Sequence, residues 1–150
     1  MNFKKTLAYA WTAPLTVPTF LLAAIALIFG WIRWEGIVED AFVFTLKHPP
    51  SWLKRKVKRS LVVGQVMLVT ERDHEKRSLV YKHALVHVQQ NRTFGVFYPF
   101  VWWFSWLLIK MMKHGDPYYD NPFEIDARRG AGQYVDVPGL MKKLGKLTSQ

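Results

Sequence analysis

The chain has 150 residues, half of them hydrophobic, with a formal net charge of +10 and no cysteine. This length and apolar content fit one domain with a buried core and exclude a disordered chain, and the missing cysteine excludes disulfides and thiolate metal sites. The positive charge indicates an anionic partner, either nucleic acid or a lipid surface.

The first element is a long apolar segment. No charged residue lies between Lys5 and Arg33, a gap of 27 residues, whereas a helix needs roughly 20 apolar residues to cross a bilayer. Residues 7–32 therefore predict a transmembrane or membrane-embedded helix, and a soluble core helix is the alternative. Because no clear small-x-small cleavage site precedes Trp31, we expect a retained anchor segment over residues 1–34, followed by a domain over residues 35–150.

Details of this segment bear on its orientation. Trp11, Trp31 and Trp34 lie near its ends, as aromatic residues at membrane interfaces do, and Pro14 and Pro18 predict a bend or a helix start. Lys4 and Lys5 precede the segment, and a second basic run, Lys54–Arg59, follows it. A helix that bends and does not fully cross would keep both basic runs on one face of the membrane.

The central part of the chain predicts strands around a basic run. Residues 42–46 and 61–70 are β-prone and could form an antiparallel pair. Between them, residues 52–59 carry five basic side chains in eight positions. We expect Lys54–Arg59 to bind anionic lipid headgroups while Trp52 and Leu53 enter the interface. Nucleic-acid binding is the less favoured alternative.

The second half predicts helices, so that the fold class is mostly α with a small β element. The first should run from about Asp73 to about Asn91, with Thr70 or Asp73 as its N-cap and a break at Gly95. Residues 94–112 hold three tryptophans and predict an interfacial or re-entrant helix, a core helix, or both. Asn121 before Pro122 predicts the start of a short helix that reaches about residue 129.

Two histidines on the predicted central helix form the candidate metal site. His83 and His87 are four residues apart, so both imidazoles face the same side of the helix and can reach one ion. Glu124 lies in the first turn of the short helix and would complete a His₂Glu zinc set. Asp116 and Asp120 stay open as alternative third ligands, whereas we do not expect the remaining histidines to bind metal: His48, His74 and His114.

The sequence around these residues resembles a known family. It reads His83-Ala84-Leu85-Val86-His87-Val88-Gln89-Gln90, then Phe94-Gly95, then an aromatic helix, then Tyr118-Tyr-Asp-Asn-Pro-Phe-Glu124-Ile-Asp-Ala-Arg128. These runs, within about residues 60–130, resemble small membrane-associated metallopeptidases of bacteria and phages, whose motifs read H-E-x-V-H-V-x-Q, F-G and Y-x-x-N-P-F-E-x-E-A. The resemblance implies a minimal zincin-like domain in which His83, His87 and Glu124 bind Zn²⁺.

The resemblance also implies a function and further residues. It points to hydrolysis of peptide bonds in a peptide or membrane-protein substrate, at a membrane such as the bacterial inner membrane. Tyr118, Asn121 and Asp126 match family positions without an assigned role, and Asp126 is expected to support one of the histidines.

The departure from the family pattern is Ala84, which stands where the family has its general-base glutamate. Alanine cannot take a proton, and the loss of a general base typically lowers the rate by about 10²–10⁴-fold. The chain is therefore expected to be nearly inactive. Two explanations stay open, an engineered Glu→Ala change and a natural pseudoenzyme. The alternative function is that of a non-catalytic membrane scaffold or a partner-binding pseudoenzyme.

Overall fold

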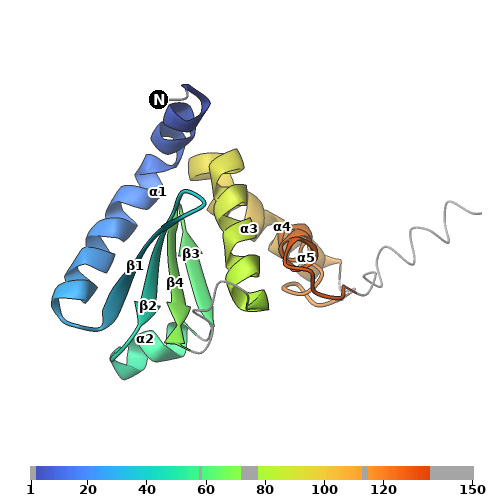
Figure 1. Cartoon of the computed structure of the whole chain (residues 1–150). Coiled ribbons are helices and arrows are strands. Elements are labelled where there is room, and N and C mark those ends of the chain that lie inside the picture. The colour runs from blue at the N-terminus through green and yellow to red at the C-terminus, as the bar shows by residue number, and fades with distance from the viewer. Residues whose placement is uncertain (1–2, 58, 72–77, 113–114, 136–150) are drawn as a thin grey trace, which may run out of the picture.

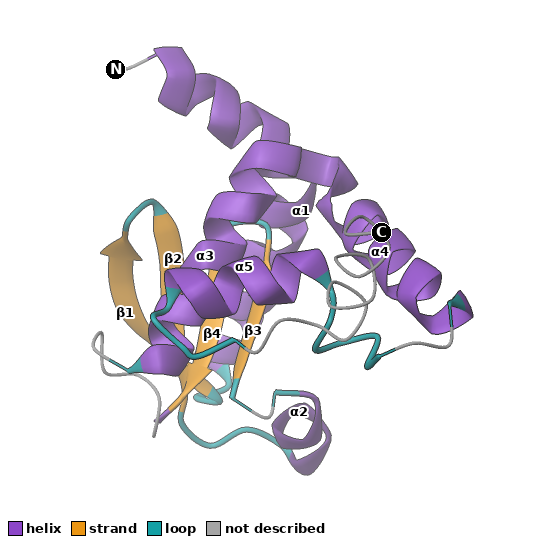
Figure 2. Cartoon of the chain, turned by 90° about the vertical axis from the view of Figure 1, so that its right-hand side faces the viewer, coloured by secondary structure: helices purple, strands orange, loops and turns teal. Residues whose placement is uncertain are grey.

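A computed structural model describes residues 3–57, 59–71, 78–112 and 115–135 of the chain. Helices hold most of these residues, and four short strands form a small sheet, so the expectation of a mostly α fold with a small β element is confirmed (Figures 1 and 2). The helices are α1 (Phe3–Ile28), α2 (Ser51–Lys56), α3 (Leu79–Phe94), the 3₁₀ helix η2 (Gly95–Phe97), α4 (Tyr98–Met111) and α5 (Pro122–Gly130), and the strands are β1 (Ile32–Val38), β2 (Ala41–Leu46), β3 (Ser60–Val63) and β4 (Val66–Thr70).

The four strands form one mixed sheet in the order β1-β2-β4-β3. The predicted antiparallel pair is wrong, because residues 61–70 are not one strand but most of a hairpin, and its second strand, β4, pairs with β2 in parallel. The hairpin turns at Gly64, whose φ of +60° suits a two-residue turn. A Cβ at Gly64 would also lie 2.5 Å from Thr16 Oγ1 of α1, so the turn packs directly on that helix.

Helix α1 differs from the predicted segment at both ends. It spans Phe3–Ile28 with Pro14 and Pro18 inside it, and the chain turns at Gly30 into the unpredicted strand β1. The prediction that the prolines mark a helix start is wrong. Each proline removes one helical hydrogen bond, while contacts with the rest of the fold, such as that of Thr16, hold the surrounding turns. Two stretches, Ala8–Ile28 and Leu79–Met111, are long and apolar enough to cross a membrane.

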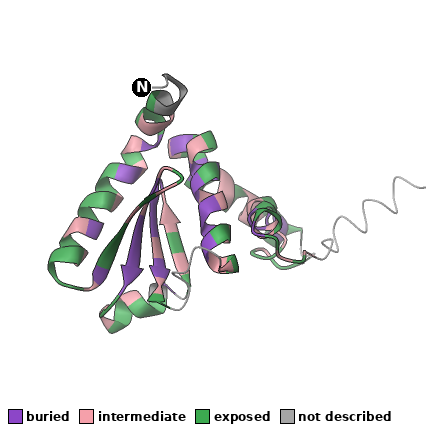
Figure 3. Cartoon of the chain, viewed as in Figure 1, coloured by how far each residue is buried: buried purple, intermediate pink, exposed green. Residues whose placement is uncertain are grey.

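Alternating side chains of the sheet pack on helices from two sides. The sheet thus lies between helices as the middle of three layers, and its central strands are largely buried (Figure 3). On one face, Val43, Met67 and Val69 pack against α3. On the other, Phe44, Leu46 and Val66 pack with residues of α1 and with Val57, which follows α2. This arrangement follows from the period of two along each strand, and it makes α3 and α1 cover opposite faces of the sheet.

The C-terminal helices begin and end at identifiable residues. Ser78 caps α3 by accepting a hydrogen bond from Tyr81 N at 3.0 Å, so neither Thr70 nor Asp73 is the N-cap, and Asp73 lies outside the described residues. Gly95 ends α3 as predicted, with a φ of +57°, and a Cβ there would overlap the Trp11 indole. Asn121 caps α5 as predicted, since its Oδ1 accepts from Phe123 N at 3.1 Å.

Candidate metal centre

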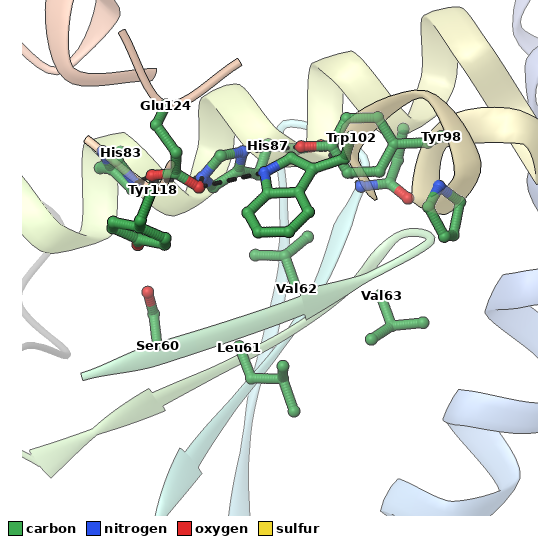
Figure 4. Close-up of a pocket in the computed structure, with 12 residues that line it drawn as sticks. Ser60, Leu61, Val62, Val63, His83, His87, Tyr98, Trp102, Tyr118 and Glu124 are labelled. Atoms are coloured by element: carbon green, nitrogen blue, oxygen red, sulfur yellow. Dashed lines mark hydrogen bonds and ion pairs between the residues drawn. The ribbon is translucent and has the colours of Figure 1, made fainter. Parts of the chain in front are cut away.

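Three side chains from two helices converge on one point of the structure. His83 and His87 lie one turn apart on α3, and Glu124 reaches them from the first turn of α5 (Figure 4). The two Nε2 atoms are 3.0 Å apart, and each lies 3.3 Å from one oxygen of the Glu124 carboxylate. These three residues form a group whose ligand atoms all lie within 4.8 Å of one another. The structure thus brings together the three residues that the sequence singled out, in a group that could hold a metal ion.

The spacing of these atoms fits a tetrahedral metal site. Zinc binds histidine nitrogen and carboxylate oxygen at about 2.0–2.2 Å, so two ligands of one tetrahedral ion lie roughly 3.3 Å apart. The observed separations of 3.0, 3.3 and 3.3 Å are close to that value. Two imidazoles and one carboxylate are also a donor set that zinc accepts. The residues present therefore fit a zinc ion.

A hydrogen-bond network fixes which nitrogen of His87 faces the centre. Gln90 Nε2 donates to Phe123 O at 3.0 Å and to Asp126 Oδ2 at 2.8 Å, and this places Gln90 Oε1 2.9 Å from His87 Nδ1. Because a carbonyl oxygen only accepts, His87 Nδ1 carries the proton and Nε2 keeps its lone pair. Tyr98 OH donates to the same Gln90 oxygen at 2.9 Å. His87 is thus held as a ligand through its Nε2.

Glu124 is buried, with only 3% of its surface exposed, and is positioned by α4 as well as by α5. Trp102 Nε1 donates to its Oε1 at 3.3 Å, and Asn121, three residues earlier, donates to Trp102 O at 3.2 Å. Burial alone would raise the pKa of Glu124, but the His83 and His87 imidazoles beside its carboxylate outweigh burial and hold that pKa well below its usual range. The carboxylate is therefore kept ionised.

Two atoms of the centre lack a hydrogen-bond partner among the described residues. They are His83 Nδ1 and Glu124 Oε2, and both are buried. A buried polar atom without a partner costs roughly 1–3 kcal/mol, so a ligand for the Glu124 oxygen would offset part of that cost. This observation adds to the spacing as a sign that the centre is built for a cation.

The centre opens into a cleft of about 360 Å³, which is lined on one side by strand β3 and on the other by the metal-ligand helices. Strand β3 is an edge strand of the sheet. Thr70 N on β4 donates to Arg59 O at 3.0 Å, so Leu61 and Val63 turn their backbone groups toward β4, and Ser60 and Val62 turn theirs to the free edge. Among the described residues, no strand pairs with this edge, which forms one wall of the cleft.

Ala84 is fully buried, and it packs with Val43, Met67 and Val69 of the sheet. One residue corresponds to about 100° around a helix, which places Ala84 at the border between the sheet-facing side of α3 and the side that carries His83. No side-chain atom at this position reaches the metal ligands. Among the described residues, no carboxylate other than Glu124 lines the cleft.

The remaining predicted residues fall into two groups. Tyr118 lines the cleft, and its partial burial together with the charge of Glu124 raises the pKa of its hydroxyl to about 12. Asp126 supports the centre through Gln90 and does not contact a histidine directly. Asp116 and Asp120 lie outside the metal-ligand group and accept hydrogen bonds from backbone amides of their own turn.

Of the other histidines, His48 is exposed, lies before α2 and is not part of the metal-ligand group. The expectations for His74 and His114 fall outside the described residues.

Gln90, Tyr98 and Trp102 complete the centre, and sequence reasoning gave none of them a role. Gln90 lies three residues after His87, on the same face of α3, and this spacing is a signal that could have identified it. Tyr98 and Trp102 lie on α4 four residues apart, and their pairing with α3 and α5 depends on the fold. Comparison of the chain with protein-family models, curated proteins and solved structures gave no match.

Proposed function

We propose that the chain binds zinc at His83, His87 and Glu124, in a membrane-associated site laid out as that of a zinc peptidase. The observation that carries the proposal is the convergence of two imidazole nitrogens and a carboxylate at separations of 3.0–3.3 Å, in a cleft beside a free strand edge. The resemblance to HExxH metallopeptidases supports the same assignment.

Each residue of the proposed zinc site would have a separate role. His83, His87 and Glu124 hold the ion, and Gln90 keeps His87 in the tautomer that binds it. A zinc ion held there supplies Lewis-acid polarisation of a carbonyl oxygen and activates water electrostatically. Ala84 cannot take a proton from a water molecule. The site as it stands would therefore bind a peptide but scarcely hydrolyse it.

The free edge of β3 supports a peptide as the substrate class. An extended peptide can add to an unpaired strand edge, with affinity from backbone hydrogen bonds. Ser60 and Val62 offer such groups, and β3 lines the same cleft as the metal ligands. A peptide that pairs with this edge would bring its backbone carbonyl groups toward the metal centre.

Metal content of the purified full chain tests the proposal. We expect one zinc ion per chain after equilibration with zinc and dialysis, and less than a tenth of that in the His83→Ala and Glu124→Ala variants. Asp116→Ala is the matched control, since it removes a carboxylate of the neighbouring loop, and it should keep the zinc. A full chain that is folded by circular dichroism and holds no stoichiometric zinc would overturn the proposal.

A second function is favoured by the burial of Ala84, which packs in the core with side chains of the sheet. In that case the chain is a zinc-stabilised pseudoenzyme that binds a peptide or protein partner at the membrane. Ala84→Glu separates the two functions. Cleavage of casein or of the chain itself by this variant, and not by Ala84→Gln, supports the peptidase. Zinc binding without cleavage supports the pseudoenzyme.

A further inference from the structure

The outward side of α1 is an apolar surface that nothing in the described structure covers. It is formed by large hydrophobic side chains, with Leu22 67% exposed and Ile28 83% exposed. Between Lys5 and Arg33 the sequence holds no charge that could keep this surface in water. The exposed side chains are Val17, Leu21, Leu22, Ile25, Ile28 and, just beyond the helix, Phe29. A surface of this kind marks an interaction site.

The inward side of α1 contacts the folded domain along most of the helix. Near its N-terminus, Tyr9 OH donates to Asp40 Oδ1 at 3.2 Å in the β1–β2 turn. In its middle, Thr16 Oγ1 accepts from Gln65 N at 3.1 Å. Toward its C-terminus, the rings of Phe20 and Phe42 lie 5.1 Å apart, and Ala23 belongs to the core. Over most of its length α1 therefore runs alongside the sheet, and only its N-terminal turns reach beyond the end of the strands (Figure 1).

This placement conflicts with a helix that crosses a bilayer. The 26 residues of α1 are about 39 Å long at 1.5 Å per residue, so a crossing helix would take its sheet contacts into the hydrocarbon. Strands β1 and β3 are the edges of an open sheet, and unpaired backbone groups of such edges are not tolerated against lipid. With the observed packing, α1 cannot stand perpendicular to the membrane.

We propose that α1 lies in the plane of an anionic membrane surface, immersed by its outward side in one leaflet, with the N-terminus and the domain on the same side of the bilayer. The metal ligands belong to the other face of the sheet, on α3 and α5. The proposal therefore goes beyond the zinc site and does not depend on metal binding.

The C-terminal end of α1 carries the residues that such an interface requires. Trp31 stacks on Phe29 and meets Trp52 edge-on, with ring centroids 5.1 and 6.2 Å apart. Trp52 is exposed, and Lys54 and Arg55 follow it on the exposed side of α2. Tryptophan favours the headgroup level of a bilayer, and basic residues beside it attract anionic lipids. Together these residues indicate that the surface binds an anionic lipid.

A cavity beneath α1 fits the same partner. It measures about 290 Å³, lies between α1, the sheet and α2, and is partly open to the surface. Its lining is apolar except for Thr19, whose hydroxyl already donates to Leu15 O at 2.7 Å. Such a space offers water no hydrogen bonds, whereas a lipid chain end could fill it.

Single-cysteine labelling tests the orientation, and the absence of native cysteine makes it clean. Thr6→Cys places a thiol at the start of α1 and Ser51→Cys places one at the start of α2, and both residues are exposed. In sealed vesicles from expressing cells, we expect a membrane-impermeant maleimide to label the two positions equally. The two positions should also label equally with each other after detergent is added. Labelling of one position before detergent and of the other only after it would show a crossing helix and overturn the proposal.

Vesicle sedimentation of the full chain tests the surface itself. Leu22→Glu with Ile28→Glu should weaken binding to vesicles of phosphatidylglycerol and phosphatidylcholine more than ten-fold, with an unchanged circular dichroism spectrum. Leu79→Glu is the matched control, since Leu79 is an exposed leucine on α3, and it should bind as the parent chain does. Equal binding of the double variant and the parent chain would contradict the proposal.

The basic residues are tested with the same assay. Lys54→Gln with Arg55→Gln should weaken binding to the anionic vesicles by about 25-fold, since each basic residue near an anionic surface is worth about 1 kcal/mol, or about five-fold. Binding to pure phosphatidylcholine should stay within two-fold. A loss of the same size on both kinds of vesicle would remove the anionic lipid from the proposal.

Discussion

Replacement of Gln90 by leucine tests whether the hydrogen-bond network of the centre sets its affinity for metal. Gln90 is buried and touches neither metal-facing nitrogen, yet its Oε1 fixes the proton of His87 on Nδ1. Leucine has a similar size and no polar atom, so Gln90→Leu frees the His87 ring to rotate or change tautomer. Loss of such a supporting residue typically weakens metal binding 10–100-fold, or about 1.4–2.7 kcal/mol.

The same substitution also removes contacts that join α3 to its neighbours. Gln90 bonds to His87, to Tyr98 OH and to Phe123 O, and each net hydrogen bond is worth about 1 kcal/mol. We therefore expect the metal-free variant to lose about 3 kcal/mol of unfolding free energy and still to fold. Asp126, the fourth partner, is exposed and can bond to water instead.

Competition titration of zinc against a chelating dye measures the affinity, and urea unfolding measures the stability. Gln89→Leu is the matched control, because Gln89 is the preceding residue on α3 and is exposed. Nitrogen-15 spectra of the imidazoles should show the Nδ1-protonated tautomer of His87 in the parent chain. If Gln90→Leu binds zinc as tightly as Gln89→Leu does, the network does not set the affinity and the reasoning is wrong.

Three further predictions concern stability. The pKa of Glu124 in the folded chain lies below its unfolded value near 4.5. Ionisation of Glu124 therefore stabilises the metal-free fold above pH 4.5, and this stabilisation is lost as the pH falls through the folded pKa. Glu124→Gln should reduce the loss of unfolding free energy at acid pH, measured by urea titration at several pH values. Gly95→Ala should lower the unfolding free energy by about 2 kcal/mol through backbone strain, and further through overlap with Trp11. Gly30→Ala should show the strain alone, because no atom lies within 4 Å of a Cβ there, and calorimetry can compare the two variants. Asn121→Ala should lose about 1 kcal/mol and weaken zinc binding, since it uncaps the helix that carries Glu124.

The helices of the second half could be predicted because their boundaries are local. Gly95 and Asn121 act on their own backbone neighbours, so the break after α3 and the start of α5 follow from residue type and position. The sheet could not be predicted in the same way. Residues 61–70 are β-prone except at Gly64, where a glycine fits a bulge within one strand as well as a turn between two. The close approach of Gly64 to Thr16, 48 residues earlier in the chain, accompanies the turn and cannot be read from the local sequence.

The group that could hold a metal ion was accessible from sequence because helix spacing and residue chemistry suffice for two of its members. Glu124 came from the resemblance and from its place in a first turn, and the fold brings it to within 3.3 Å of both histidines. Gln90 and Trp102 could not be given roles from sequence. An amide and an indole occur widely as surface or core residues, and only the packing of α3, α4 and α5 reveals their hydrogen bonds to the centre.

The contacts that hold the candidate metal centre do not depend on position 84. His87 is held through Gln90, and Glu124 is held through Trp102 and the cap at Asn121, and none of these contacts involves Ala84. Alanine at this position packs in the core among apolar side chains, where a carboxylate away from a metal or water would be costly to bury. Loss of the base would therefore leave the site geometry intact and stabilise the helix that carries it. The same argument applies to an engineered change and to a natural pseudoenzyme. Measuring both the peptidase activity and the unfolding free energy of Ala84→Glu beside those of the parent chain would show whether a glutamate at this position adds activity at the expense of stability.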